Sequence, residues 1–531
     1  MKKRIGIFGW GVVGPKTPNV EAFEKNLEKA DCWLEPFVGV GPNNFLVGTP
    51  DFAFEDYKPW IDKNFEPRRF AQLNEKMGNM VKYAIGAFIQ SLGQNPGIEK
   101  VLSALGTQAH VYVGTGLGDY PKQYELSIKY YRAQQRWNEF WCSDECHPEL
   151  ASYRKSTEEE KEKFRAAINA PVDPESLGID AIGYEDATEA WQLFWLERSD
   201  ALLSYLDELR EIESENIGKD IDASKSQVIR RKMAARKKLS AKYGAPVEPW
   251  NAVEANLLWN IANIPAAQIS MLGHITGPAY APVAACSTFS TALGLAYNAI
   301  QAGQAKAVVI GATDPEPHPL SVGTFYNARV LSNDGQVSKP LTGLRGTHVS
   351  GGACIWIVGD VDYMKEQGMK PIGLEILGVG VTSDADHIIT PSIEGSNAAI
   401  QLALAEAGVK SDEIDTWDMH ATATPGDWTE IHNSLEQFPD ACCLTARKGT
   451  FGHGMSVCGG WELTAQHMGI VKGNIFPVNI TEDELHPQIR NCTDSLVSEE
   501  GAPVMGSISG KINMGVGGIN ACTISRRWDD D

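Results

Sequence analysis

The 531-residue chain lacks the long apolar runs that membrane-spanning helices require. No uninterrupted stretch approaches the roughly 18 to 20 apolar residues that cross a bilayer. The opening "MKKRIGIFGWGVVGP" has too short an apolar stretch, and no small-residue cleavage signal, for a secretory leader. We therefore expect a cytoplasmic protein without a membrane span.

An excess of positive charge and a disulfide-scaffold pattern are also missing. The formal net charge is −21, which argues against general nucleic-acid binding, because such binding needs a basic surface that displaces counterions from phosphates. The 10 cysteines are scattered, with no scaffold spacing, and suit a reducing compartment. We expect free thiols and no nucleic-acid partner.

Two segments look like binding motifs but lack the context that those motifs need. "GWGVVG" at 9–14 matches G-x-G-x-x-G, yet Pro15 follows it, no helix opens there, and no acidic residue ends a second strand at the usual distance. "CSDECH" at 142–147 has neither the haem spacing nor a second pair of zinc ligands. We expect structural roles for both segments and no metal site.

The sequence does contain alternating strand-like and helical segments, which a helical region interrupts. In 1–120, β-like runs such as "RIGIFGW" and "HVYVGTG" alternate with helical runs such as "MGNMVKYAIGAFIQSLG". From about 121 to 250 come charged segments with apolar spacing near 3.6, such as "DALLSYLDELREIE". From 251 strand-like and helical segments alternate again. The pattern predicts an α/β protein with a mainly helical insertion.

The segment "APVAACSTFST" at 281–291 places Cys286 at a predicted turn between a strand and a helix. A helix N-terminus favours a thiolate and offers backbone N–H groups to an oxyanion. Buried cysteines without reactivity are common, so the local spacing leaves open whether Cys286 is a nucleophile or a small core residue.

Three later segments supply what a cysteine acyl nucleophile requires. "DMHATATPGDWTE" places His420 after an apparent strand end, "ARKGTFGHGMSVCGGWE" places Lys448 five residues before His453, and "NMGVGGIN" forms a glycine-rich loop. Together with Cys286, these segments resemble the β-ketoacyl-acyl-carrier-protein synthases, the condensing branch of the thiolase fold. Weaker matches are "FYNARVLS" at 325–332 and "TSDADH" at 382–387.

The resemblance implies a fold class and a domain organisation. It covers roughly 1–120 and 251–531 and implies a thiolase-like, duplicated α/β/α/β/α layered core with a mainly helical insertion. The N-terminal half would be 1–366, interrupted at about 121–250, and the C-terminal half 367–531. The duplication explains a faint internal similarity, because two helical segments end "NAIQAG" and "HMGIVKG" and each leads to an apolar strand.

The resemblance also implies residue roles. Cys286 takes the acyl chain, while His420 and His453 hold the thioester carbonyl of malonyl-carrier and stabilise the enolate that decarboxylation leaves. Lys448 orients the site by pairing with Glu462. The other implied residues are the oxyanion-hole backbone of Cys286 and Val516, the supporting acids Asp427 and Glu430, and the substrate contacts Thr422, Thr424, Phe325, Leu258 and Trp259.

Some positions depart from the family pattern. Val516 stands where the family has an aromatic gate, so we expect a pocket that accepts a bulky or rigid acyl chain, or a looser order of the two substrates. His420 to Asp427 spans seven residues where the family usually has eight. The segment "NLLWNIAN" resembles the stretch that crosses the dimer interface and bounds the acyl tunnel, which is why Leu258 and Trp259 are expected to set its depth.

These implications give an expected function. The chain is expected to perform β-ketoacyl synthase-like decarboxylative condensation of an acyl thioester with malonyl-acyl carrier protein in fatty-acid or polyketide-type biosynthesis. It would need no cofactor of its own, because phosphopantetheine arrives on the carrier protein, and it would form a homodimer, or a heterodimer with a related subunit. Two alternatives remain, a non-condensing acyltransferase on the same fold and a non-catalytic partner subunit.

A basic run within the insertion has two interpretations. "SKSQVIRRKMAARKKLSAK" carries eight Lys and Arg residues without an intervening acid. The run is either a helix face that solvent and the insertion's own acidic segments neutralise, or a docking surface that steers an acidic acyl carrier protein by long-range attraction.

Overall fold

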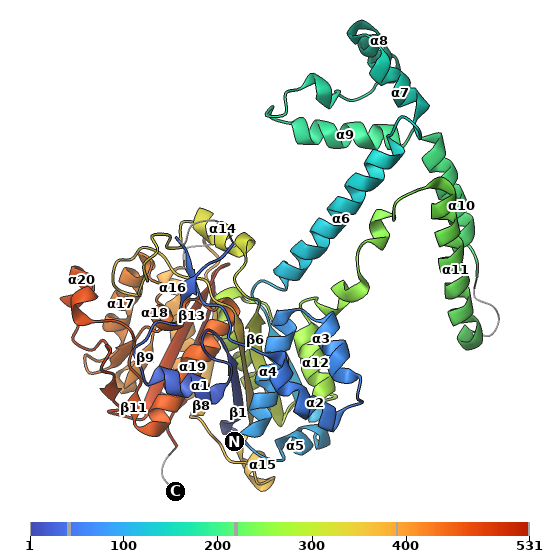
Figure 1. Cartoon of the computed structure of the whole chain (residues 1–531). Helices are drawn as coiled ribbons and strands as arrows, with labels where there is room; N and C mark the ends of the chain where they lie inside the picture. Colours follow the sequence, from blue (N-terminus) through green and yellow to red (C-terminus); the bar gives the residue numbers. More distant parts are fainter. Residues whose placement is uncertain (1, 40–43, 217–220, 389–390, 529–531) are drawn as a thin grey trace. The chain divides into compact units, whose positions relative to one another are not determined.

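The computed structural model describes residues 2–39, 44–216, 221–388 and 391–528 (Figure 1). The chain divides into two compact units, which are described separately. The first comprises Met1–Lys122 and Asn256–Asp531, and the second comprises Gln123–Ala255. Among the residues described, no helix combines the length and the apolarity needed to cross a bilayer.

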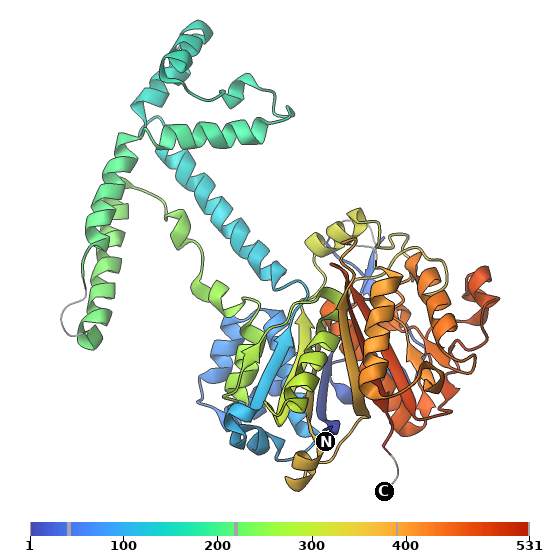
Figure 2. The ribbon, with the colours of Figure 1, turned by 180° about the vertical axis from the view of Figure 1, so that it is seen from behind.

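The first unit is built on a 10-stranded mixed sheet (Figures 1 and 2). From one edge to the other the strands are β10 (Cys443–Thr445), β9 (Thr416–Asp418), β13 (Ile508–Gly515), β14 (Ile519–Arg526), β8 (Glu375–Ser383), β1 (Ile5–Val13), β7 (Gly352–Asp360), β6 (Ala307–Asp314), β4 (Ala109–Gly114) and β5 (Ala279–Tyr280). Two small sheets flank it, β2 (Glu35–Pro36) with β3 (Leu46–Val47), and β11 (Asn474–Ile475) with β12 (Ala502–Pro503).

The large sheet consists of two halves with the same strand pattern. In the N-terminal half, β1, β7 and β6 pair antiparallel, and β6, β4 and β5 pair parallel. In the C-terminal half, β8, β14 and β13 pair antiparallel, and β13, β9 and β10 pair parallel. The halves meet at the Ile5–Ile376 pair. This repetition agrees with the internal similarity seen in the sequence.

Helices cover both faces of this sheet. The central helices α13 (Thr288–Gln301) and α19 (Cys458–Lys472) pack against each other and share one hydrophobic cluster. α4 (Asn79–Gly93) and α12 (Ile264–Leu272) lie on the outer face of the N-terminal half, and α16 (Ile393–Ala407) and α17 (Gly426–Gln437) on that of the C-terminal half. The shorter helices are α1 (Val20–Leu27), α2 (Lys58–Asn64), α3 (Arg69–Lys76), α5 (Ile98–Ala104), α14 (Pro319–Asn327), α15 (Val361–Glu366), α18 (Lys448–Phe451) and α20 (Pro487–Arg490).

The glycines of the "GWGVVG" segment allow close packing inside this core. Gly9 and Gly11 lie in β1, whose residues are all buried. A Cβ atom on Gly11 would lie 1.8 Å from the carbonyl oxygen of Ala87, and one on Gly9 would lie 2.2 Å from that of Ser91. Both carbonyls belong to α4, so glycine is needed because the helix backbone rests directly on the strand.

The second unit is helical, as the insertion was predicted to be. Its helices are α6 (Tyr120–Trp141), which begins just before the unit, α7 (Pro148–Lys155), α8 (Glu158–Ile168), α9 (Tyr184–Leu196), α10 (Asp200–Glu213) and α11 (Ile221–Tyr243). Its core is aromatic and contains Trp137, Trp141, Trp191 and Trp195. In "CSDECH", both ring nitrogens of His147 are engaged, because Nδ1 accepts from the Leu150 N–H and Nε2 bonds the Trp195 carbonyl. That segment therefore has a structural role.

Candidate active site

Cys286 lies on a strained turn at the N-terminus of α13. The turn is a single 3₁₀ segment, Ala285–Ser287, and Ala285 adopts a left-handed φ of 46°, which is unfavourable for a residue with a side chain. Gly515 supports this turn, because a Cβ there would lie 2.8 Å from the Ala284 oxygen and 3.3 Å from the Cys286 nitrogen. The end of β13 therefore lies directly against the Cys286 backbone.

The C-terminal half repeats this turn just after His453. A 3₁₀ segment, Met455–Val457, leads into α19, and Met455 has a φ of 50°. The backbone of His453 is fixed on both sides, since its N–H donates to the His348 carbonyl at 2.7 Å and its carbonyl accepts from the Ser350 N–H at 2.9 Å. The duplicated fold therefore places Cys286 within one turn and His453 just before the equivalent turn.

Asp314, which the sequence analysis missed, ties the two halves together at these turns. It ends β6, is buried, and accepts from the N–H of Ser456 at 2.9 Å and from the Thr115 hydroxyl at 2.7 Å. Ser456 occupies in the second turn the place that Cys286 has in the first. The side chain of Asp314 thus fixes the turn after His453 against the loop after β4.

His420 begins a loop that two buried carboxylates hold. Glu430 accepts from the N–H groups of His420 and Ala421, and Asp427 accepts from those of Thr422 and Ala423 at 2.8 and 3.0 Å. Burial raises the pKa of Asp427 to about 6 and the pKa of Glu430 to about 7. Asp427 also accepts from the Leu341 N–H at 2.9 Å. Its carboxylate therefore ties the loop after His420 to the backbone at Leu341.

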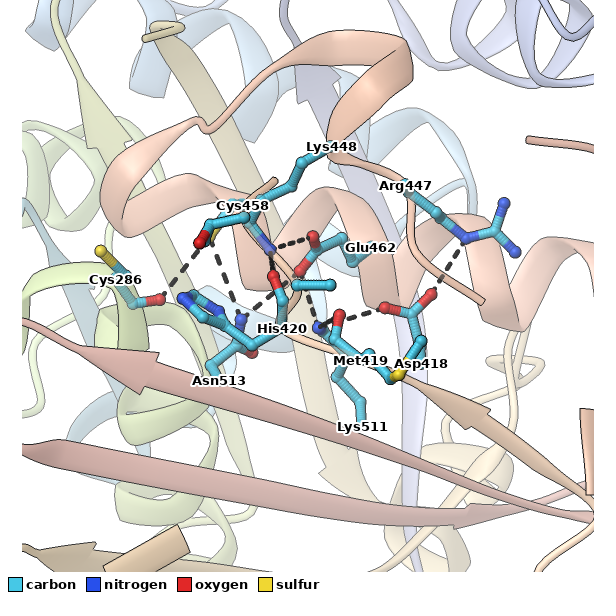
Figure 3. A network of polar contacts seen from close by, with 12 residues as sticks. Cys286, Asp418, Met419, His420, Arg447, Lys448, Cys458, Glu462, Lys511 and Asn513 are labelled. Atoms are coloured by element: carbon cyan, nitrogen blue, oxygen red, sulfur yellow. Dashed lines mark hydrogen bonds and ion pairs between the residues drawn. The ribbon is translucent and has the colours of Figure 1, made fainter. Parts of the chain in front are cut away.

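A buried network of charges lies behind His420 (Figure 3). Lys448 Nζ lies 2.6 Å from Glu462 Oε1 and also donates to the His420 carbonyl. Lys511 Nζ lies 2.8 Å from Glu462 Oε2 and 3.1 Å from Asp418 Oδ1, and Arg447 Nε lies 3.0 Å from Asp418 Oδ2. None of the five side chains is more than 2% exposed. The network fixes His420 because Lys448 bonds its main chain.

Two members of this network keep their charges despite burial. Burial disfavours the ammonium of Lys448, but the carboxylate of Glu462 more than compensates and raises the lysine's pKa. Burial likewise disfavours the carboxylate of Glu462, but Lys448 and Lys511 lower its pKa below the ordinary value. Lys448 is therefore a fixed positive charge near both catalytic-site imidazoles.

The two imidazoles are neutral. Burial, followed by the charge of Lys448, lowers the pKa of His420 and of His453 well below 6.5. Their ring centroids are 5.5 Å apart and the rings are steeply inclined, at 80°. The Nδ1 atom of each ring is buried and has no hydrogen-bond partner. We assign the ring proton to Nε2 in both, because a buried N–H without an acceptor is costly.

One cavity of about 530 Å³ brings the predicted residues together. Its lining includes Cys286, His420, His453, Thr422, Thr424, Phe325, Val516, Asp427 and Glu430. Lys448 and Glu462 lie behind the lining. Leu258 and Trp259 do not line this cavity: the Leu258 side chain is exposed, and Trp259 packs against the N-terminal core below the Lys76 ammonium. Their expected role across a dimer interface concerns a second chain and stays a prediction.

The electrostatics of Cys286 differ from the sequence-based expectation. Burial raises the pKa of the thiol to about 11, although Lys448 and the backbone N–H groups of Val516 and Cys286 act in the opposite direction. The expectation that the helix N-terminus favours the thiolate is therefore not met, because removal from water outweighs the nearby positive charge and N–H groups. The same two N–H groups that were predicted to form an oxyanion hole converge on the sulfur.

This raised pKa predicts a steep pH dependence for alkylation of Cys286. Only the thiolate reacts, and below the pKa its fraction grows about tenfold per pH unit. We expect the rate of iodoacetamide labelling at Cys286, followed by peptide mass spectrometry, to rise about tenfold per unit between pH 7 and 9. Cys492, which is a half-buried free cysteine, provides an internal comparison. A labelling rate that is already flat above pH 7 would show that Cys286 carries a stabilised thiolate.

Several site residues were not found from the sequence. Asp418, Arg447, Lys511 and Asn513 belong to the buried network, and Asn513 accepts from the Ser290 hydroxyl at 2.9 Å. A signal did exist for two of them. In "SISGKINMG", a lysine and an asparagine alternate with apolar residues in an otherwise core-like strand, which indicates that one face of this strand meets a polar interior.

The paired half-sheets around two central helices define a thiolase-like fold. Solved structures with this fold include "The ishigamide ketosynthase/chain length factor", with a TM-score of 0.66 and 17% identity over 100% of both chains. A β-ketoacyl synthase from Burkholderia phymatum STM815 gives a TM-score of 0.65 and 18% identity, covering 99% of this chain and 100% of that one. The predicted fold class is confirmed.

The sequence is similar to one family with this fold. Residues 224–358 match the β-ketoacyl synthase N-terminal domain and residues 374–480 match the C-terminal domain. Over these residues the chain is similar to the β-ketoacyl synthase family. It is 30% identical over 279 residues to 3-oxoacyl-[acyl-carrier-protein] synthase 2 of Rhizobium meliloti, and 27% identical over 282 residues to the 3-oxoacyl-[acyl-carrier-protein] synthase homolog of Saccharomyces cerevisiae. These stretches cover 50% and 51% of this chain, and 65% and 63% of the relatives.

Proposed function

We propose that this chain is an acyltransferase of the 3-oxoacyl-[acyl-carrier-protein] synthase type, which condenses an acyl thioester with malonyl-acyl carrier protein in fatty-acid or polyketide-type biosynthesis. One observation carries the proposal. A single cavity contains the Cys286 sulfur beside two backbone N–H groups, together with the neutral imidazoles of His420 and His453. A thioester in this cavity meets a nucleophile and hydrogen-bond donors for both of its charged intermediates.

In the first half-reaction, the sulfur of Cys286 attacks the thioester carbonyl of the acyl carrier. A bond forms between this sulfur and the acyl carbon, and the bond from that carbon to the carrier's sulfur breaks. The carrier leaves as a thiol with the proton that Cys286 loses. The oxygen that becomes negative during this exchange is stabilised by the N–H groups of Cys286 and Val516, which already point at the reacting sulfur.

In the second half-reaction, malonyl-carrier loses carbon dioxide. The electrons of the broken carbon–carbon bond place negative charge on the thioester oxygen, and the Nε2–H groups of His420 and His453 donate to that oxygen. The resulting enolate carbon attacks the acyl group on Cys286. A new carbon–carbon bond forms, the acyl–sulfur bond breaks, and the released cysteine thiolate takes up a proton from solvent. Neutral imidazoles suit this role because each already has one N–H group and needs no added proton to donate.

The substrate arm and the assembly state follow from the same proposal. Thr422 and Thr424 line the cavity and their hydroxyls lie 3.0 Å apart, so they offer hydrogen bonds to the phosphopantetheine arm that the carrier brings. The enzyme would need no cofactor of its own. A solved ketosynthase of this fold, with a TM-score of 0.61 and 15% identity over 100% of both chains, is described as in complex with a type II polyketide acyl-carrier protein.

We also propose a homodimer, or a heterodimer with a related subunit, in which Leu258 and Trp259 bound the cavity of the other chain.

Carbon dioxide release tests this function. The purified protein, pre-charged with an acyl thioester, is mixed with malonyl-acyl carrier protein labelled in the free carboxyl group. The proposal predicts labelled carbon dioxide in step with a β-ketoacyl product on the carrier. Acyl-enzyme without carbon dioxide would indicate a non-condensing acyltransferase. Neither product would indicate a non-catalytic partner subunit.

The basic run of the insertion forms part of α11, and half of its cations already have acidic partners. Those partners come from α10, from the residues just after α10 and from Glu248: Arg231 pairs with Glu215, Lys232 with Glu213, Arg236 with Glu213 and Glu248, and Lys242 with Glu208. Within the described chain, Lys225, Arg230, Lys237 and Lys238 are exposed and have no ion pair among those found. Docking of an acidic carrier protein would therefore depend on these four side chains.

Charge reversal on α11 tests this docking surface. We expect Arg230→Glu with Lys237→Glu and Lys238→Glu to raise the apparent KM for acyl-carrier substrates at low salt, because the long-range attraction is lost. The difference should shrink as salt rises, since the Debye length is about 8 Å at physiological ionic strength. Kinetics with a small pantetheine thioester should be unchanged. If carrier-dependent kinetics are unaltered at every salt concentration, α11 is ordinary surface.

A further inference from the structure

Asp314 is a buried carboxylate that the chemistry proposed above does not use. The residue is 1% exposed, and five hydrogen-bond donors surround its side chain. Oδ1 accepts from the Thr115 hydroxyl at 2.7 Å and from the N–H groups of Gly116 and Leu117 at 3.0 and 3.1 Å. Oδ2 accepts from the N–H of Ser456 at 2.9 Å and from its hydroxyl at 2.5 Å. One oxygen therefore holds the loop after β4, and the other holds the turn before α19.

Only a side chain with two acceptor atoms can hold both segments. The backbone N–H groups at the two oxygens of Asp314 can donate but cannot accept. Burial raises the pKa of Asp314, and the hydrogen bonds from Ser456 and from the loop act in the opposite direction. An asparagine has the same shape but offers one acceptor and one donor. Because the loop supplies three donors and the turn two, we expect the amide oxygen to stay with the loop and the turn to be released.

The turn that contains Ser456 is strained and depends on its surroundings. Met455 has a left-handed φ of 50°, which a residue with a side chain keeps only where neighbouring groups hold it. Ser456 follows directly, so its two hydrogen bonds to Asp314 hold the chain in this conformation. Met455 also lines the cavity. Without the carboxylate, the turn is expected to relax and to change this wall of the cavity.

The imidazole of His453 lies just before this turn. Its Nδ1 has no hydrogen-bond partner among the described residues, so no polar contact orients the ring from that side. Main-chain bonds to His348 and Ser350 hold the backbone of His453, and Asp314 holds the chain three residues further on, at Ser456. A relaxed turn is therefore expected to move the ring relative to the thioester oxygen that it is proposed to contact.

The equivalent turn at Cys286 is held by different contacts. There the Ser287 hydroxyl donates to the Ile519 carbonyl at 2.7 Å, a bond that does not involve Asp314. The duplicated fold thus fixes its two turns independently. Loss of the Asp314 carboxylate should release the turn next to His453 and leave the nucleophile's own turn in place.

We infer that Asp314 is a positioning residue for the decarboxylation step, because it holds the turn after His453 and thereby sets where that imidazole meets the malonyl thioester. Asp314 does not line the cavity, so it acts through Ser456 rather than on the reacting atoms. The inference rests on the proposed condensation. It also divides the two half-reactions, because acyl transfer to Cys286 is proposed to proceed without His453.

Asp314→Asn tests this role in the full-length protein. Two rates are measured. The first is formation of acyl-Cys286 from a pantetheine acyl thioester, followed by intact mass, and the second is release of labelled carbon dioxide from malonyl-acyl carrier protein by the pre-acylated protein. We expect the second rate to fall about 10- to 100-fold, since a small misplacement of a reacting or stabilising group is costly, while the first changes by less than about threefold.

Two further variants make the comparison decisive. Ser456→Ala removes the hydroxyl that donates to Oδ2 but keeps the main-chain bond, so it should slow carbon dioxide release in the same direction and by less. Asp360→Asn is the matched control. Asp360 is also buried and ends β7, but it lies at the opposite end of the sheet, because Asp314 pairs with Gly352, the first residue of β7. Any loss of stability in this control should leave the ratio of the two rates unchanged.

The possible results separate the two claims. Equal losses of both rates in Asp314→Asn, or two unchanged rates, overturn the positioning role and leave the proposed function intact. A ratio that changes as much in Asp360→Asn has the same meaning. If Asp314→Asn does not fold, an unchanged ratio in Ser456→Ala overturns the role. Wild-type protein that releases no carbon dioxide would overturn the proposed function and this inference together.

Discussion

Cys286→Ala is expected to abolish acyl-enzyme formation and condensation while leaving the fold intact. Replacing a thiol by a methyl group almost conserves volume, so the strained turn before α13 should persist. The matched control is Cys458→Ala. Cys458 is also buried, and its sulfur lies 3.7 Å from the Cys286 carbonyl oxygen, but it does not line the cavity. Acylation should survive in that variant, as measured by intact mass.

Substitution of either histidine should slow the second half-reaction far more than the first. The charge that His420 and His453 are proposed to stabilise develops only when malonyl-carrier loses carbon dioxide. His420→Ala or His453→Ala should therefore still accept an acyl group, but should release carbon dioxide about 10²–10³-fold more slowly, the usual effect of removing one donor from an oxyanion site. Equal losses in both half-reactions would contradict this division of roles, and condensation in Cys286→Ala would contradict the nucleophile.

The second large expected effect is a lower stability of the fold when Glu462 is replaced by Gln. Glu462 is the acid shared by Lys448 and Lys511, and all three side chains are buried. Glu462→Gln leaves Lys448 without a carboxylate partner, while Lys511 keeps only Asp418. Removing one partner from a buried ion pair commonly costs about 3–5 kcal/mol, because the remaining charge is neither solvated nor paired. We expect a clearly lower midpoint in thermal and urea unfolding of this variant.

An exposed ion pair provides the control for this effect. Lys339 and Glu484 lie 2.7 Å apart with 21% and 40% of their side chains exposed. Glu484→Gln should cost about 0–1 kcal/mol, since solvent screens such pairs. If Glu462→Gln unfolds at the same midpoint as Glu484→Gln, the buried network does not stabilise the core. A destabilised Glu462→Gln should also lose activity, because Lys448 holds the main chain of His420.

Site residues could be predicted from the sequence where they stand at the recognisable start of a helix or end of a strand. Cys286 and His453 each stand before a helix with a recognisable apolar pattern, and the β9 segment ends in a polar turn at His420, so each could be assigned to a strand-to-helix connection. The family resemblance then supplied their joint role. The helical insertion could be located because charged residues with a 3.6-residue period replace the strand pattern, and its observed bounds are 123–255.

What could not be predicted depends on contacts between distant segments. Asp314 looks like an ordinary residue at the end of an apolar strand, and its role appears only when β6 delivers it to the turn after His453 in the opposite half. The raised pKa of the Cys286 thiol reflects how deeply the assembled core buries it, which the helix pattern alone does not encode. Likewise, α11 is basic in sequence, but only the fold shows that the acids of α10 and its neighbours neutralise half of its charges.

The most direct test of the account is the mass of the intact protein during one turnover. After incubation with an acyl-carrier thioester, the account predicts one acyl increment, located on the peptide that contains Cys286. Adding malonyl-acyl carrier protein should remove this increment as a β-ketoacyl chain, longer by one malonyl-derived unit, appears on the carrier. Absence of the increment, or an equal increment in Cys286→Ala, would contradict the central claim that Cys286 is the nucleophile of a condensing enzyme.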